Sequence, residues 1–161
     1  MLDNLINLVR EHAGDAIINN PAIPNERNDE AISATSNSIV DTLKNAAQGG
    51  GLQDIMQLFQ GDQSNSGGLL SNISGGLVQN LMSQFGINQQ QAGGIADGLI
   101  PNVLQSLVSK TNDPNDNSFD IQGILSNIGG GNLDIGGILN QFTGGSNSGG
   151  GLMDGLKGLF K

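Results

Sequence analysis

Residues 85–110, FGINQQQAGGIADGLIPNVLQSLVSK, contain the strongest helix signals in the chain. Gly86 is predicted to end one helix in the left-handed conformation that glycine adopts easily. Asn88 and Gln91 then have the spacing of a capping box, in which two side chains satisfy free backbone N–H groups at the start of the next helix. Apolar residues recur at helical spacing as far as Val108. We therefore expect one helix to end and another to begin here, within an all-α fold.

Pro101 lies inside this second helix. Proline has no amide hydrogen, and its ring would clash with the carbonyl of Asp97 in an uninterrupted helix. A kink or a restart is therefore predicted at Pro101. After Lys110, the residues TNDPNDNS favour turns and are expected to end the helix.

The same 3.6-residue spacing of apolar side chains predicts further helices on both sides. Residues 62–68, DQSNSGG, are expected to form a flexible loop, and residues 69–76 a turn or two before a break at Gly75-Gly76, with the helix resuming at Leu77. Residues 15–27 contain Pro21 and Pro24 and are expected to form an ordered connector. The other helices are expected at residues 2–13, from Pro24 or Asn28 to Ala47, and at 52–60. The predicted fold is a small bundle of short amphipathic helices joined by Gly-rich loops.

Two internal similarities suggest duplication. Residues 23–43 align without gaps on residues 87–107, which predicts a duplicated helix-loop-helix unit, although chance resemblance between amphipathic helices is the alternative. FDIQGILSNIGGGN at 119–132 matches LDIGGILNQFTGGS at 133–146. We expect residues 1–118 to form a helical bundle. Residues 119–161 are expected to form Gly-rich short-helix repeats and an amphipathic tail that docks on the bundle or on a partner.

The composition excludes several classes of function. Fifteen acidic and six basic residues give a net charge of −9, which would repel nucleic acid. There is no cysteine, so neither a disulfide nor a thiolate metal site is available. The N-terminal residues do not resemble a secretory signal, and no run approaches the ~18 apolar residues of a spanning helix. A cytoplasmic location without a transmembrane segment is expected.

The polar residues give no catalytic, cofactor or metal site. His12 is the only histidine and lies near a helix end, where a capping or surface role is expected. Asp113 and its neighbours resemble a calcium loop, but Ser118 and Ile124 stand where glycine and glutamate are needed, so a turn is expected. The Gly-rich runs lack the pattern of a phosphate-binding loop. We therefore expect a protein that is not an enzyme.

The leading hypothesis is a non-enzymatic interaction or self-assembly protein whose partner is another protein or a second copy of this chain. Short helices on glycine hinges offer small apolar faces, and exposed faces of this kind mark interfaces. One alternative is a helical binder of a small apolar ligand or lipid. Another is weak membrane contact through residues 151–161, whose alternative is docking on the protein's own bundle. The candidate interaction faces are Ile124, Leu125, Ile128, Ile138, Leu139, Phe142, Leu152, Leu156, Leu159 and Phe160.

The glycine-flanked G-[IL]-L-x-x-[IF]-x-G-G segments and residues 85–110 resemble the YidB-like bacterial family of unknown function. NNPAIPNERNDEAI at 19–32 resembles the variant of that family found in Bacteroidetes-type bacteria. The chain is poorer in leucine and richer in asparagine and serine than many such sequences. The resemblance implies an all-helical fold and a bacterial source, and it brings no catalytic or binding residues.

Overall fold

The computed structural model describes residues 2–61 and 67–128. The chain divides into two compact units, Met1–Gly131 and Asn132–Lys161. The first unit thus extends past the boundary expected after residue 118. The second unit, which contains the second copy of the short repeat, lies outside the described residues.

The regular secondary structure of the described residues is entirely helical, which confirms the all-α prediction. The connector expected at residues 15–27 is ordered and partly helical. The elements in chain order are α1 (Leu2–His12), the π-helical turn η1 (Gly14–Ile18), the 3-10 turn η2 (Asn25–Arg27), α2 (Asn28–Gln48), α3 (Leu52–Phe59), α4 (Gly67–Phe85), α5 (Gln89–Thr111) and α6 (Ile121–Ile128).

The predicted boundary between α4 and α5 is confirmed in detail. Gly86 has a φ of 66°, the left-handed conformation expected of a helix end. The Asn88 side-chain oxygen accepts a hydrogen bond from the Gln91 N–H at 2.8 Å, and the Gln91 side-chain oxygen accepts one from the Asn88 N–H at 3.2 Å. This capping box fixes where α5 begins.

The predicted break at Gly75 and Gly76 is wrong, because α4 runs unbroken from Gly67 to Phe85. A glycine inside a helix costs about 1 kcal/mol relative to alanine. Burying one Leu or Ile side chain contributes roughly 1.5–3 kcal/mol, so the buried stripe of α4 outweighs both glycines. The buried side chains of this stripe are Leu69, Ile73, Leu77 and Leu81.

Of the kink or restart predicted at Pro101, the restart is absent, since α5 is a single helix, and the kink stays a prediction. Pro101 itself is exposed, whereas Ile100 and Val103 beside it are completely buried. Burial on both sides of the proline holds the two halves of the helix together despite the lost amide hydrogen bond.

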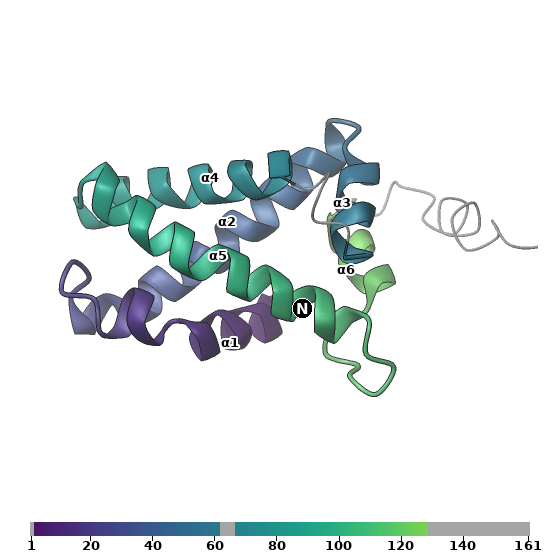
Figure 1. Ribbon diagram of the computed structural model, residues 1–161, viewed down its shortest axis with the longest axis horizontal. Helices are drawn as coiled ribbons and strands as arrows, with labels where there is room; N and C mark the ends of the chain where they lie inside the picture. Colours follow the sequence, from purple (N-terminus) through teal and green to yellow (C-terminus); the bar gives the residue numbers. More distant parts are fainter. Residues whose placement is uncertain (1, 62–66, 129–161) are drawn as a thin grey trace, which may run out of the picture. The chain divides into compact units, whose positions relative to one another are not determined.

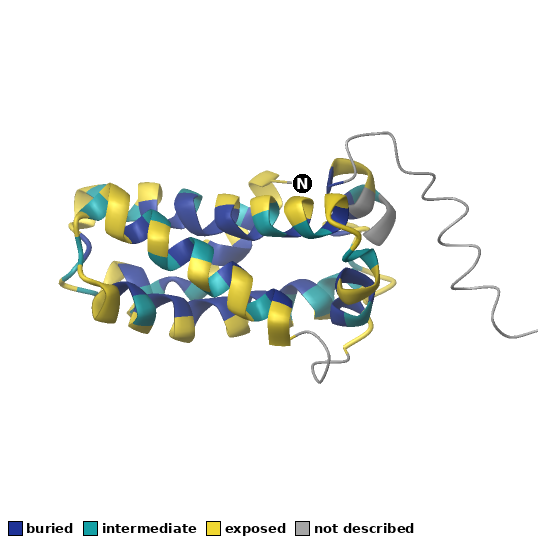
Figure 2. Cartoon of the chain, turned by 90° about the horizontal axis from the view of Figure 1, so that it is seen from above, coloured by how far each residue is buried: buried dark blue, intermediate teal, exposed yellow. Residues whose placement is uncertain are grey.

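In the view of Figure 1, α4 runs along one side and α1 along the other, and α5 crosses in front of α2 between them. Helix α4 packs against both α2 and α5, and α1 packs against the same two helices. Short α3 contacts α2 and α5, and short α6 contacts α2. Buried residues face the interior between the helices (Figure 2), and the core is mainly aliphatic.

The unit contains two halves, α1 to α2 and α4 to α5, whose residues correspond at a constant offset. The predicted duplication pairs Ile23 with Ile87, an offset of 64 residues, and the same offset also relates α1 with η1 to α4. Most buried positions coincide along both pairs of segments, whereas the buried residues Leu8, Ala34 and Ser38 correspond to the exposed residues Asn72, Gly98 and Asn102. The pairs in which both members are buried are Leu5 with Leu69, Val9 with Ile73, Ala13 with Leu77, Ile17 with Leu81, Ala31 with Ile95, Ile32 with Ala96, Thr35 with Leu99, Ser36 with Ile100, Ile39 with Val103, and Leu43 with Leu107. Each residue in one half can therefore be compared with the residue 64 positions away in the other half.

Candidate functional site

A pocket of about 170 Å³ opens between α3, α4 and α5. We call it the α3–α5 pocket. Among residues 2–61 and 67–128, the lining residues are Leu58, Gly61, Leu70, Pro101, Leu104, Gln105 and Val108. Gln105 is the only one of these seven that carries a polar side chain. A concave, mainly apolar site with one polar group has the character of a ligand-binding pocket.

One face of α5 supplies most of the lining. Residues 101, 104, 105 and 108 recur at the spacing that places side chains on one side of a helix. Leu104 is buried, whereas Pro101 and Gln105 are exposed and so lie at the mouth. The capping box fixes the start of α5 and thereby the register of this face.

The opposite wall comes from the end of α3. Gly61 has a φ of 83°, which favours glycine and turns the chain at the end of this helix. The Asn112 side-chain nitrogen donates a hydrogen bond to the Phe59 carbonyl at 2.7 Å. This bond joins the end of α3 to the end of α5, the two helices that supply opposite walls of the pocket.

The equivalent surface of the first half is polar. Leu104 and Leu70 have apolar counterparts in Val40 and Ile6. The counterparts of Pro101, Gln105 and Val108 on α2 are Asn37, Asp41 and Lys44. The same helix positions therefore tolerate polar and charged side chains, and the fold does not require the apolar lining of the α3–α5 pocket.

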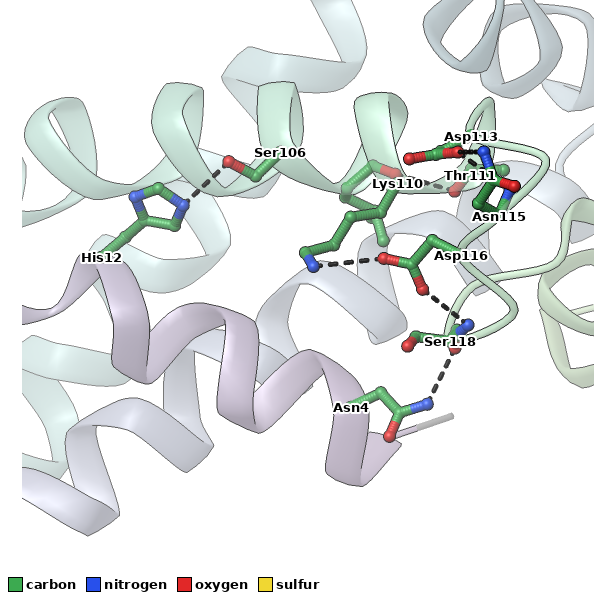
Figure 3. Close-up of polar contacts among 10 residues, drawn as sticks. Asn4, His12, Ser106, Lys110, Thr111, Asp113, Asn115, Asp116 and Ser118 are labelled. Carbon is green, nitrogen blue, oxygen red and sulfur yellow. Dashed lines mark hydrogen bonds and ion pairs between the residues drawn. The ribbon is translucent and has the colours of Figure 1, made fainter.

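His12 is the last residue of α1, and its half-buried side chain contacts α5. Its Nε2 atom lies 2.8 Å from the Ser106 hydroxyl, and the ring tautomer decides which group donates (Figure 3). The equivalent positions in the other half are Gly76 and Thr42. There the small glycine leaves a shallow polar groove between α2 and α4. The His12 hydrogen bond thus joins two helices, a role that the sequence did not reveal.

The acidic loop after α5 forms turns, as predicted (Figure 3). Asp113 accepts a hydrogen bond from the Asn115 N–H at 2.9 Å, and Asp116 accepts one from the Ser118 N–H at 2.9 Å. Lys110 pairs with Asp116 at 3.2 Å. Hydrogen bonds from the side chain and backbone of Ser118, followed by the contact with Lys110, hold the pKa of Asp116 below its ordinary value. The side-chain oxygens of this loop thus serve the turns themselves.

No group of three or more His, Cys, Asp or Glu side chains that could hold a metal ion occurs within residues 2–61 and 67–128. In the same part of the chain, no helix is both long and apolar enough to cross a membrane.

Two predicted interaction residues lie in the core of the first unit. Ile124 is 2% exposed and Ile128 is 1% exposed, so the protein's own helices cover them. Leu125 belongs to the same helix, α6. The remaining candidates lie outside the described residues, and they are Ile138, Leu139, Phe142, Leu152, Leu156, Leu159 and Phe160.

The described part of the chain is thus an all-α unit with two equivalent halves and an apolar pocket on the second half. Comparison with family models, curated proteins and solved structures found no match to this chain. The resemblance to the YidB-like family therefore stays a prediction.

Proposed function

We propose that this protein is a non-enzymatic binding protein and that its α3–α5 pocket takes up a small apolar ligand. The observation that carries this proposal is the contrast between the two halves. Pro101 and Val108 present apolar surface where the equivalent helix has Asn37 and Lys44. Apolar side chains at positions where the fold accepts polar ones favour a binding role over a structural one.

The first test asks whether the pocket binds an uncharged probe. Benzene suits it because an apolar cavity of about 150 Å³ holds one benzene molecule. We expect benzene to raise the melting temperature of the wild-type protein in a saturable way, because a ligand that binds only the folded state stabilises it. Native mass spectrometry of freshly purified protein would further show whether a natural ligand is retained.

The variant Val108→Lys should abolish this stabilisation. It introduces the residue found at the equivalent position, Lys44, so the helix is expected to fold normally. Ser109→Lys adds the same charge at the next, exposed position of α5 and is the matched control. An equal effect of benzene on both variants, or no effect on the wild type, would contradict the proposal.

A second candidate function is self-assembly. Ile124 and Ile128 of the first short repeat are buried in the first unit. Ile138 and Phe142 stand at the same positions of the second repeat. We propose that the second repeat buries these side chains against a second copy of the protein, because a short helix is marginal in water without a packing partner.

Size-exclusion chromatography with light scattering over a wide concentration range tests self-assembly. The full chain is expected to form oligomers, and the double variant Ile138→Ser, Phe142→Ser is expected to lose them. Asn140→Ser changes a polar position between the two and serves as the control. A strict monomer at every concentration would remove this candidate and leave the pocket proposal intact.

Three further expectations stay predictions. They are the cytoplasmic location, the absence of enzymatic activity and weak membrane contact through residues 151–161. Liposome flotation of the full chain and of a variant lacking these residues would test the third. The net charge of −9 opposes tight binding to anionic lipid.

A further inference from the structure

We infer that the ligand of the α3–α5 pocket is a neutral, mainly aliphatic molecule with a single uncharged hydrogen-bonding end, such as a medium-chain alcohol or amide. This inference rests on the proposed function and adds the chemical class of the ligand. It follows from the volume of the pocket, from Gln105 as the one polar side chain among its described lining residues, and from the charges that stand at the equivalent positions of the other half.

The volume limits the size of the ligand. The pocket holds about 170 Å³. Since an apolar cavity of about 150 Å³ accommodates the six carbons of benzene, the pocket fits about six to eight non-hydrogen atoms. A longer chain would have to extend past the exposed residues Pro101 and Gln105 into water, where further methylene groups gain little from burial.

Gln105 determines what the ligand end can be. Its side-chain amide offers both a donor and an acceptor, so it can pair with a hydroxyl, an amide or a carbonyl. Because Gln105 is exposed at the mouth, the hydrogen-bonding end of the ligand stays near water while the aliphatic part lies against Leu58 and Leu104. In apolar binding sites, hydrophobic side chains usually cover most of the ligand and a few polar groups fix its orientation.

The equivalent surface on α2 shows which charges are missing. Asp41 stands at the position of Gln105, and Lys44 stands at the position of Val108. An acidic and a basic group at these positions would offer partners to ionic ligands, whereas none of the seven lining side chains of the pocket is charged. A charged end beside Gln105 would therefore meet no opposite charge among these seven side chains, and any movement of that end toward Leu104 would cost part of its hydration, which is unfavourable. The net charge of −9 disfavours carboxylates further.

A series of n-alcohols tests the size limit. With isothermal titration calorimetry, we expect the affinity to rise about fourfold for each added methylene, from n-butanol onward. The rise should stop between about n-hexanol and n-octanol, when the chain fills the pocket. An affinity that keeps rising by the same factor up to n-dodecanol would overturn the size limit.

Three probes of equal length test the charge class, namely n-hexanol, hexanoate and hexylammonium. Both ions should bind at least about tenfold more weakly than n-hexanol, because neither finds a charged partner in the lining. Equal or tighter binding of either ion would overturn the inference that the ligand is neutral.

The variant Gln105→Met separates the recognition of the ligand end from apolar binding. Loss of one hydrogen bond should weaken n-hexanol by about 2- to 12-fold and leave benzene unchanged. Because Gln105 is exposed, the variant is expected to fold, and Gln105→Asn offers a second, shorter amide. If benzene binds but n-hexanol is insensitive to both variants, the inference fails and the proposed function stands. If benzene does not bind the wild type, the proposed function itself fails.

Discussion

Replacing Gly94 by alanine is expected to stabilise the protein, whereas the same replacement at Gly86 is expected to destabilise it. A Cβ atom built at either glycine meets no neighbouring atom within 4 Å, so the surrounding space is equivalent. The two positions differ in backbone conformation. Gly94 lies inside the α5 helix, and Gly86 has a left-handed φ of 66°.

The magnitudes follow from this difference. Alanine is more favourable than glycine inside a helix by about 0.8–1.0 kcal/mol, so Gly94→Ala should raise the free energy of unfolding by about that amount. A side chain in the left-handed region costs roughly 1–2 kcal/mol, so Gly86→Ala should lower it by about that amount. The two variants should therefore differ by roughly 2–3 kcal/mol.

Urea denaturation of the full chain, followed by circular dichroism, measures both values. The slope of the free energy against urea concentration should stay the same in both variants, which would show that the surface exposed on unfolding has not changed. Equal shifts of the same sign at Gly94 and Gly86 would refute the reasoning, because the space around the two glycines cannot distinguish them.

Three further changes test the contacts that hold the helices in place. Asn88→Ala removes the N-cap of α5 and should lower the free energy of unfolding by about 1 kcal/mol in urea denaturation, and an unchanged value would contradict the role of the capping box. Arg27→Ala removes a guanidinium that lies 4.3 Å from the centre of the Phe85 ring and donates to the Gln84 carbonyl. Thermal denaturation should show that the free energy of unfolding falls by about 1 kcal/mol. Arg27→Lys should show most of the same decrease, because lysine lacks the planar guanidinium. Asp116→Asn should destabilise the protein at neutral pH, because the lowered pKa of Asp116 in the folded state means that folding favours its ionised form. The difference in stability from the wild type should disappear as the pH falls below the ordinary aspartate range and Asp116 becomes protonated. A difference that persists in acid would contradict this role of the ionised Asp116.

The sequence predicted the parts of the fold that depend on neighbouring residues. The boundary between α4 and α5 could be predicted directly, because Gly86, Asn88 and Gln91 act through contacts that span four residues or fewer. The helices with a clear apolar stripe were found for the same reason. The turns after α5 were recognised from asparagine and aspartate, whose side chains bond to the nearby backbone.

The errors came from applying local rules where distant packing decides. Gly75 and Pro101 are unfavourable inside a helix on their own, yet both lie inside continuous helices. The energy that offsets them comes from packing against other helices, which are α2 and α5 for Gly75 in α4, and α1 and α4 for Pro101 in α5.

The candidate site was accessible only in part. The duplication was visible in the sequence, and aligning the halves could have shown that Lys44 and Val108 stand at equivalent positions. That Val108 faces a pocket, together with Leu58 at the end of another helix, depends on how α3 and α5 are packed. The contact between His12 and Ser106 likewise joins residues 94 positions apart. Sequence spacing determines which side chains share a helix face, but a pocket is the space left between faces of different helices, and only the tertiary structure fixes that space.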